Sequence, residues 1–271
     1  MKGELQELGP TINSPNNDHV KYLRSLQRRR VRYKERRFIV EGLRLVEDAL
    51  RAGVVPALVF FAREVGASPR GAALLRELRS TIADIFPVGP NIMKMVTDTA
   101  SLQGVVAVVP FVELLPQGKD LFLVVDRVQD PGNLGTLLRS AEAAGVQQAL
   151  LAPGTVDAFS PKVVRAGAGV HFRLPIKAAG WPEIRALVKG KSVRLAEEGS
   201  PTAYYEVDWK RPAALIVCNE GSGPSDEARV LATERIAVPM HGDPESLNVG
   251  VAASVILFEA ARQRALAGRA G

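Results

Sequence analysis

The 271-residue chain has one cysteine, three histidines and few aromatic residues (6%). A single Cys218 excludes an internal disulfide, and the spacing of His19, His171 and His241 fits no zinc site, so we expect a metal-free protein. No apolar run approaches the roughly 18 residues that a membrane span needs. The N-terminal residues "MKGELQELGP" lack the apolar core of a secretory signal. We therefore expect a cytoplasmic protein without membrane attachment.

Two common nucleotide-binding patterns are also missing. The sequence has no G-x-x-x-x-G-K-[ST], and no G-x-G-x-x-G that follows a strand and precedes an acidic residue. The run "GAGV" at 167–170 follows a predicted helix, where a dinucleotide loop does not belong. A nucleoside triphosphatase is therefore disfavoured. A nicotinamide-dependent dehydrogenase is a weak alternative, which a nicotinamide titration tests.

The composition, 46% hydrophobic and 24% charged, is that of a globular protein with a full core. Strand and helix patterns alternate in two blocks, which predicts an α/β fold with two domains. Near-continuous apolar strands in the second block predict a parallel sheet covered on both faces, with ligands beyond the carboxyl ends of its strands. We expect a tail at 1–17, a smaller α/β domain at 18–111, a linker at 112–120 and the main domain at 121–271.

Three local expectations concern single elements. The basic segment after residue 17 reads as one helix with Asp18 as its cap. The run "VHFRLPI" (170–176) reads as a strand, and "GNLGTLLRSAEAAG" as a turn followed by a helix that starts near Gly135.

The net charge of +6 is concentrated in the first half of the chain. Between Lys21 and Arg37 nine basic residues accompany a single acidic residue, Glu35. This density is typical of a surface that neutralises nucleic-acid phosphates, although a solvated helix face is the simpler reading. The candidate RNA-binding residues are Lys21, Arg24, Arg28, Arg29, Arg30, Arg32, Arg36 and Arg37.

Three segments of the second block carry candidate chemistry, each after a predicted strand. In "DPGNLGTLLRSAEAAG", Asn133 follows a tight turn and Arg139 is expected about one helical turn in, near an anion-binding helix end. A turn residue and a surface cation are the plain alternatives. The second segment, "CNEGSGPS", holds Glu220. In the third, "IAVPMHGDPESLNVGVAAS", Ser246 fits a helix cap and Asn248 falls in the first turn of a long apolar helix.

In this order, N-L-G-T-x-x-R-S-A, N-E-G-S-G-P-S and V-P-M-x-G-x-x-x-S-L-N-V resemble the three motifs of the SpoU (TrmH-like) RNA ribose 2′-O-methyltransferases of the SPOUT superfamily. The likeness runs from Leu121 to Ala267. The first half resembles the substrate-binding domain of many members, which is similar to certain large-subunit ribosomal proteins.

The resemblance implies a trefoil knot, S-adenosylmethionine as cofactor, and transfer of its methyl group to a ribose in RNA, with large-subunit ribosomal RNA favoured. The sequence departs from the family's pattern at Cys218, where a glycine is usual. The implied catalytic residues are Asn133, Arg139, Glu220, Ser246 and Asn248. The implied cofactor-binding residues are Cys218, Gly221, Val238, Met240 and Leu247.

The role of each implied residue follows from its chemistry. A guanidinium stays protonated in proteins and makes a poor base. Arg139 is therefore expected to hold a phosphate and stabilise an alkoxide, and Glu220 to orient Asn133 or Arg139; the base stays unassigned. Transfer RNA as substrate, or a non-catalytic RNA-binding or ribosome-assembly protein, are the alternatives. A homodimer is expected from the resemblance and from the apolar circumference of the final helix.

Overall fold

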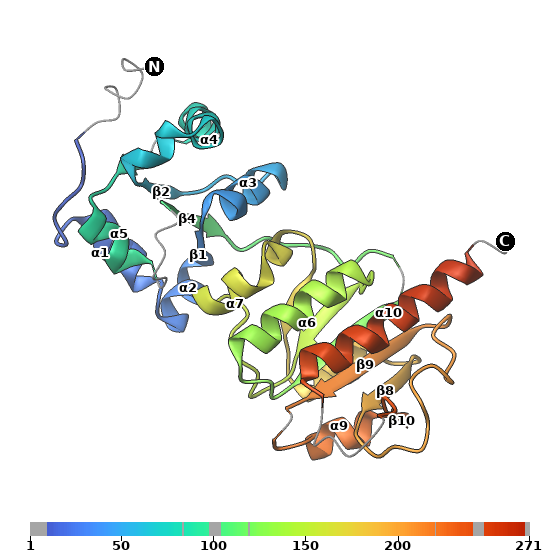
Figure 1. Cartoon of the computed structure of the whole chain (residues 1–271). Helices are drawn as coiled ribbons and strands as arrows, with labels where there is room; N and C mark the ends of the chain where they lie inside the picture. The colour runs from blue at the N-terminus through green and yellow to red at the C-terminus, as the bar shows by residue number, and fades with distance from the viewer. Residues whose placement is uncertain are drawn as a thin grey trace. The chain divides into compact units, whose positions relative to one another are not determined.

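The computed structural model describes residues 10–82, 84–97, 104–118, 120–219, 221–240 and 247–268. By its contacts the chain divides into two compact units (Figure 1). The first holds the residues up to Val112 together with Phe159–Phe172, and the second holds Glu113–Ala158 and the residues from Arg173 onward. A segment from the second half of the sequence thus completes the first unit.

A four-stranded sheet with the order β1-β4-β2-β3 forms the centre of the first unit. β4 pairs antiparallel with β1 and β2, and β2 pairs parallel with β3. The strands are β1 (Arg37–Glu41), β2 (Leu58–Phe61), β3 (Ile85–Pro87) and β4 (Val105–Pro110). The helices are α1 (Asp18–Ser25), α2 (Arg29–Glu35), α3 (Leu43–Arg51), η1 (Arg63–Ala67), α4 (Pro69–Thr81), α5 (Pro90–Val96), α7 (Pro161–Gly167) and η2 (Val170–Phe172).

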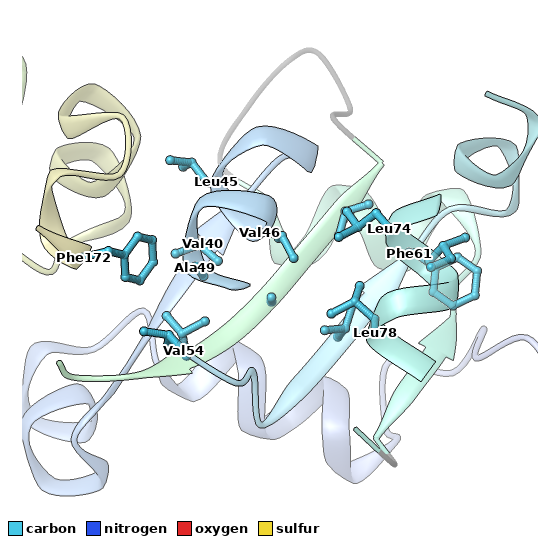
Figure 2. Close-up of a cluster of buried hydrophobic side chains, with 14 of the residues drawn as sticks. Val40, Leu45, Val46, Ala49, Val54, Phe61, Leu74, Leu78 and Phe172 are labelled. Atoms are coloured by element: carbon cyan, nitrogen blue, oxygen red, sulfur yellow. The ribbon is translucent and has the colours of Figure 1, made fainter. Parts of the chain in front are cut away.

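The segment 159–172 contributes to a hydrophobic core that β1, α3 and α4 also line. Figure 2 shows Phe172 pointing toward the side of this core that holds Val40 and Ala49. The predicted strand at 170–176 is therefore wrong in its first half: Val170–Phe172 is a 3₁₀-helix, and Ile176–Ala178 forms a short strand in the second unit. Burial of Val170 and Phe172 in the first unit keeps them from the sheet of the second.

The basic segment forms two helices, α1 and α2, and not one. Asn17 caps α1 through a hydrogen bond from the backbone nitrogen of His19 to its side chain (2.9 Å), so Asp18 is the first helical residue rather than the cap. The break between the helices is held by Arg32, whose Nη1 donates to the carbonyl oxygens of Leu26 and Gln27 at 2.8 Å each. Carbonyls at a helix end need such donors.

The second unit has a six-stranded parallel sheet in the order β10-β8-β9-β5-β6-β7, which confirms the predicted parallel α/β arrangement. Its strands are β5 (Leu121–Asp126), β6 (Gln148–Leu151), β7 (Ile176–Ala178), β8 (Ser192–Ala196), β9 (Ala213–Cys218) and β10 (Glu234–Ile236). Its helices are α6 (Pro131–Ala143), α8 (Trp181–Leu187), α9 (Asp226–Leu231) and α10 (Val249–Ala267).

Helices cover both faces of this sheet. Phe122 and Val124 of β5 belong to a core cluster with residues of α8 and α9. Leu123 and Val125 alternate with them and point to the opposite face, where α10 contacts both β9 and α6. In Figure 1 α6 and α10 run side by side. In the described part of the chain, no helix is both long and apolar enough to cross a bilayer.

Candidate functional site

A cavity of about 300 Å³ opens at the carboxyl edge of the parallel sheet, in the second unit. This is the edge where ligands bind in open α/β sheets. The ends of β8, β9 and β10 and the start of α10 form its walls, and these walls are largely apolar. They include the side chains of Val217, Cys218, Ile236, Val238, Met240, Leu247 and Ile256.

The loop that follows β9 folds over one side of the cavity. The side-chain oxygen Oδ1 of Asn219 accepts from the backbone nitrogens of Gly221 (2.9 Å) and Ser222 (3.2 Å). The chain reverses at Gly223, whose φ of 62° suits glycine. Ser225 then caps α9 by accepting from the backbone nitrogen of Ala228 at 3.2 Å. The loop is thus a tight turn, of which Asn219, Gly223 and Pro224 line the cavity.

Two consecutive residues at the end of β5 hold this loop. The fully buried carboxylate of Asp126 accepts from the backbone nitrogen of Ser225 (2.7 Å), and Arg127 Nη2 donates to the carbonyl oxygen of Gly223 (3.1 Å). The Asn219 side chain donates in turn to the Arg127 carbonyl oxygen (3.3 Å). The sequence analysis did not predict a role for Asp126 or Arg127. The signal that could have found them is a pair of charged residues at the end of a buried strand.

Asn133 and Asn248 meet, although 115 positions separate them. Asn248 Nδ2 donates to Asn133 Oδ1 at 2.8 Å. Asn248 Oδ1 accepts from the backbone nitrogens of Gly250 (3.0 Å) and Val251 (3.4 Å), so its amide orientation follows from its neighbours. Asn248 is therefore the cap of α10 itself. This corrects the expectation of a cap at Ser246 with Asn248 in the first turn; Ser246 itself lies outside the described residues.

Close packing of α6 against α10 brings these two helix starts together. The hydroxyls of Ser140 and Ser254 share a hydrogen bond of 2.7 Å. A Cβ at Gly250 would lie 3.0 Å from the Thr136 methyl carbon, so only a glycine keeps this contact without a shift. Asn248 caps the start of α10 with a neutral amide, and Asp130 caps the start of α6 with a carboxylate.

The position of Arg139 on its helix differs from the prediction. The helix starts at Pro131 with Asp130 as its cap, so Arg139 falls in the third turn of α6 and not near its N-terminus. Six residues from Asn133, it also points about 120° away around the helix axis. Its side chain is exposed and, among the described residues, makes no hydrogen bond or ion pair. The structure therefore does not bring Arg139 to the pair of asparagines.

The sequence-derived cofactor positions mostly converge on the cavity. Cys218, Val238, Met240 and Leu247 line it, whereas Gly221 does not. Glu220 and Ser246 fall outside the described residues, so their predicted roles stay predictions.

Burial raises the pKa of the Cys218 thiol to about 11, with the nearby Asp126 and Glu197 carboxylates as smaller causes. A thiol with so high a pKa is protonated at neutral pH and is a poor nucleophile. Cys218 therefore lines the cavity and is not expected to react.

Glu197 and Arg229 also line the cavity and form an ion pair, and Glu197 is 3.5 Å from Arg235 as well. The sequence pattern did not predict these residues, because Glu197 and Arg229 are 32 positions apart and neither lies in a glycine-rich turn. Among the described residues, no group of three or more His, Cys, Asp or Glu side chains is arranged to hold a metal ion.

The candidate RNA-binding residues of the first unit divide into two groups. Arg32 is only 3% exposed, because its guanidinium donates to the carbonyl oxygens between α1 and α2. The prediction that Arg32 binds a phosphate is therefore wrong, and its role is structural. Arg37 is half-buried and donates to the hydroxyl of Tyr22 at 3.0 Å. The exposed members are Lys21, Arg24, Arg28, Arg29, Arg30 and Arg36.

The parallel sheet, the cavity at its carboxyl edge and the paired helix starts define an α/β protein with a cavity of small-molecule size at the carboxyl ends of its strands. Comparison with known proteins gives the family. Residues 120–258 match the model of the SpoU rRNA Methylase family, and residues 17–107 match the MRM3-like substrate binding domain.

Full-length relatives agree with this match. The chain is 33% identical over 253 residues to the 23S rRNA (guanosine(2553)-2′-O)-methyltransferase RlmP of Bacillus subtilis, covering 91% of this chain and 97% of that protein. It is 29% identical to the 23S rRNA (uridine(2479)-2′-O)-methyltransferase of Streptomyces viridochromogenes, covering 97% and 96%. The crystal structure of AviRb from that organism with the cofactor AdoMet superposes with a TM-score of 0.84 at 28% identity, covering 92% and 99%.

The chain therefore belongs to the SpoU rRNA methylase family. The resemblance noted in its three motifs is confirmed, and so is an N-terminal substrate-binding domain.

Proposed function

We propose that the protein transfers a methyl group from S-adenosylmethionine to the 2′-hydroxyl of a ribose in ribosomal RNA. The enzyme class and the cofactor predicted from the sequence are confirmed at the level of the family. Two relatives that match along nearly the whole chain are named as 23S rRNA 2′-O-methyltransferases, which supports the ribosomal substrate. The observation that carries the proposal is the cavity at the carboxyl edge beside the Asn133–Asn248 pair.

The cavity fits the cofactor. Its apolar walls suit an adenine ring, and Asn219 and Gly223 of the tight turn after β9 line it as well. Cys218, Val238, Met240 and Leu247 are the side chains proposed to hold it, with Gly221 nearby in the loop. When bound, S-adenosylmethionine supplies a methyl group already activated on a sulfonium.

The chain's own residues then orient the accepting ribose. Asn248 holds the Asn133 amide so that the nitrogen of Asn133 can donate to an oxygen of the RNA. We propose that Arg139, on the exposed face of α6, holds a phosphate of the RNA, and we retain Glu220 and Ser246 as catalytic candidates.

We also propose a homodimer. Three apolar side chains on one face of α10, at positions i, i+4 and i+7, are exposed: Val251 (49%), Val255 (37%) and Phe258 (52%). Such a stripe is costly to leave in water, and a second copy of the chain would cover it symmetrically. Sedimentation at micromolar concentration is expected to give twice the 29.1 kDa chain mass; a 29.1 kDa species contradicts the dimer.

Four finer features of the sequence-based expectation stay proposals. The trefoil knot, a very rare feature of protein folds, is supported by the return of the chain from β10, at the sheet edge, to α10 against β9 and α6. The likeness of the first unit to large-subunit ribosomal proteins is proposed on the resemblance. The linker at 112–120 is proposed on its pattern-breaking Pro116 and Gly118, and a cytoplasmic location on the composition of the sequence.

The test is methyl transfer from labelled S-adenosylmethionine to deproteinised ribosomal RNA, with transfer RNA in parallel. Label is expected in a 2′-O-methyl nucleoside of ribosomal RNA after nuclease digestion. Arg139→Ala should lower transfer about 100-fold and change cofactor affinity little, because Arg139 is exposed on α6 and does not line the cavity. Label in a base, or in transfer RNA alone, contradicts the proposal.

A further inference from the structure

Three aromatic rings meet at the surface of the first unit, beside the basic helices. Tyr33 of α2 is 39% exposed, with its ring centroid 5.4 Å from that of Phe111 and 6.3 Å from that of Phe159, both edge to face. Phe111 and Phe159 stack on each other at 3.9 Å and an interplanar angle of 15°. We call Tyr33, Phe111 and Phe159 the aromatic platform.

The rings of the aromatic platform are held by the hydrophobic core beneath them. The buried ring of Phe38 lies 5.9 Å from Phe111 and 5.3 Å from Phe159, and both outer rings pack against the same hydrophobic core. Phe159 comes from the segment that completes the first unit, so the platform exists only in the folded tertiary structure. Rings fixed in this way lose little entropy when a flat ligand stacks on them.

Two guanidinium groups flank the rings. The Arg29 guanidinium lies over the Tyr33 ring at 5.3 Å, and that of Arg36 over the Phe111 ring at 5.9 Å. Arg29 and Tyr33 are four residues apart on α2, and thus neighbours on one helix face. Arg36 ends this helix in the left-handed conformation. Flat cationic and aromatic groups at one surface are the pair on which unpaired bases stack while phosphates are neutralised.

We propose that the aromatic platform, with Arg29 and Arg36, is a stacking site for an unpaired base of single-stranded RNA. The inference rests on the proposed function only in taking RNA as the substrate. Charge complementarity selects RNA over an apolar protein partner: between Lys21 and Arg37, seven basic residues and one acidic residue are exposed. A duplex keeps its bases stacked inside the helix, so the site discriminates single-stranded from double-stranded RNA.

Stacking and phosphate binding differ in their response to salt, which makes the site testable. The probe is a single-stranded RNA of about 12 nucleotides that carries one 2-aminopurine, whose fluorescence falls on stacking, with the matching duplex for comparison. Tyr33→Leu, which keeps an apolar side chain on α2, should lower single-strand affinity about tenfold and abolish the fluorescence change. The slope of log affinity against log salt should stay the same.

Two matched variants serve as controls for this measurement. Tyr33→Phe keeps the ring and should bind like the natural chain. Tyr205→Leu removes another exposed tyrosine (53% exposed), in the second unit, and should have no effect. Arg29→Gln should lower the salt slope by about 0.7, the loss of one phosphate contact on a single strand. Equal loss of duplex and single-strand binding in Tyr33→Leu overturns the inference.

A measurement on the natural chain covers the case in which Tyr33→Leu fails to fold. Photocrosslinking with 4-thiouridine RNA should label the peptides that contain Tyr33, Phe111 or Phe159; crosslinks confined to other peptides overturn the inference. The outcomes also separate the two proposals. If Tyr33→Leu binds RNA normally while methyl transfer proceeds, only the stacking site is wrong. If RNA stacks on Tyr33 but no methyl group is transferred, only the function is wrong.

Discussion

At the scale of single residues, Asn248 has two tasks that one substitution separates. Its oxygen caps α10, and its nitrogen donates to Asn133. Asn248→Asp keeps the cap, because aspartate caps as well as asparagine, but two facing oxygens force the Asn133 amide to turn over. We expect unchanged thermal stability with methyl transfer about 100-fold slower, measured by calorimetry and by transfer of labelled methyl groups.

Asn248→Ala is the comparison for this prediction. It removes the cap as well and should lower the free energy of unfolding by about 1 kcal/mol in addition to the loss of transfer. Normal transfer by Asn248→Asp would show that the contact between the asparagines serves folding alone.

The half-buried thiol of Cys218 should make the stability of the fold depend on pH. Its folded pKa, raised to about 11, lies above the ordinary cysteine pKa of 9.0, so the fold favours the protonated thiol. That contribution to stability is complete below pH 9 and is lost as the pH rises toward 11. Urea unfolding of the natural chain should therefore weaken over this range more than that of Cys218→Ala.

The same thiol should be alkylated by iodoacetamide at pH 8 about 100-fold more slowly than a free cysteine. Cys218→Gly, which restores the residue usual in the family, should bind S-adenosylmethionine as tightly or more tightly in calorimetry. A tenfold weaker affinity would mean that the thiol packs usefully against the cofactor.

At the scale of elements, α1 and α2 separate RNA contact from stability. Replacing the exposed Arg28, Arg29 and Arg30 together by glutamine should lower the salt slope of RNA binding by about 2–3 units and leave unfolding unchanged. Arg32→Met should do the reverse, because it leaves two carbonyls at the helix break without their donor, at a cost of about 1–3 kcal/mol. Filter binding at several salt concentrations and urea unfolding measure the two effects; an unchanged slope would place the RNA elsewhere.

At the scale of the whole molecule, the division into two units changes the design of a truncation. The cavity residues all lie in the second unit, so a chain that starts at Gly118 should still bind S-adenosylmethionine and lose RNA binding. Without the first unit, Phe159, Val164 and Phe172 lose the core they pack against. A second fragment with 159–172 replaced by a Gly/Ser linker should thus aggregate less in light scattering. Equal behaviour of both fragments would contradict this packing.

Periodicity and turn chemistry determined the elements that depend on neighbours in the sequence. The buried strand Leu121–Asp126, the long helix that ends at Ala267 and the parallel arrangement were predictable, because alternation and apolar runs report burial directly. The three motifs predicted the family, since their order and spacing are specific even where each residue alone is not.

Tertiary structure alone decided which distant residues meet. The meeting of Asn133 and Asn248 depends on the packing of α6 against α10, whereas the start of α6 at Pro131 follows from a local signal that the prediction missed, the cap Asp130 before a proline. The burial of Arg32, the clamp of Asp126 and Arg127 on the loop after β9, and the joining of 159–172 to the first unit all arise from contacts with no sequence periodicity. Residues far apart in the chain carry no local signal of their pairing, because the packing that selects it exists only once the whole core has formed.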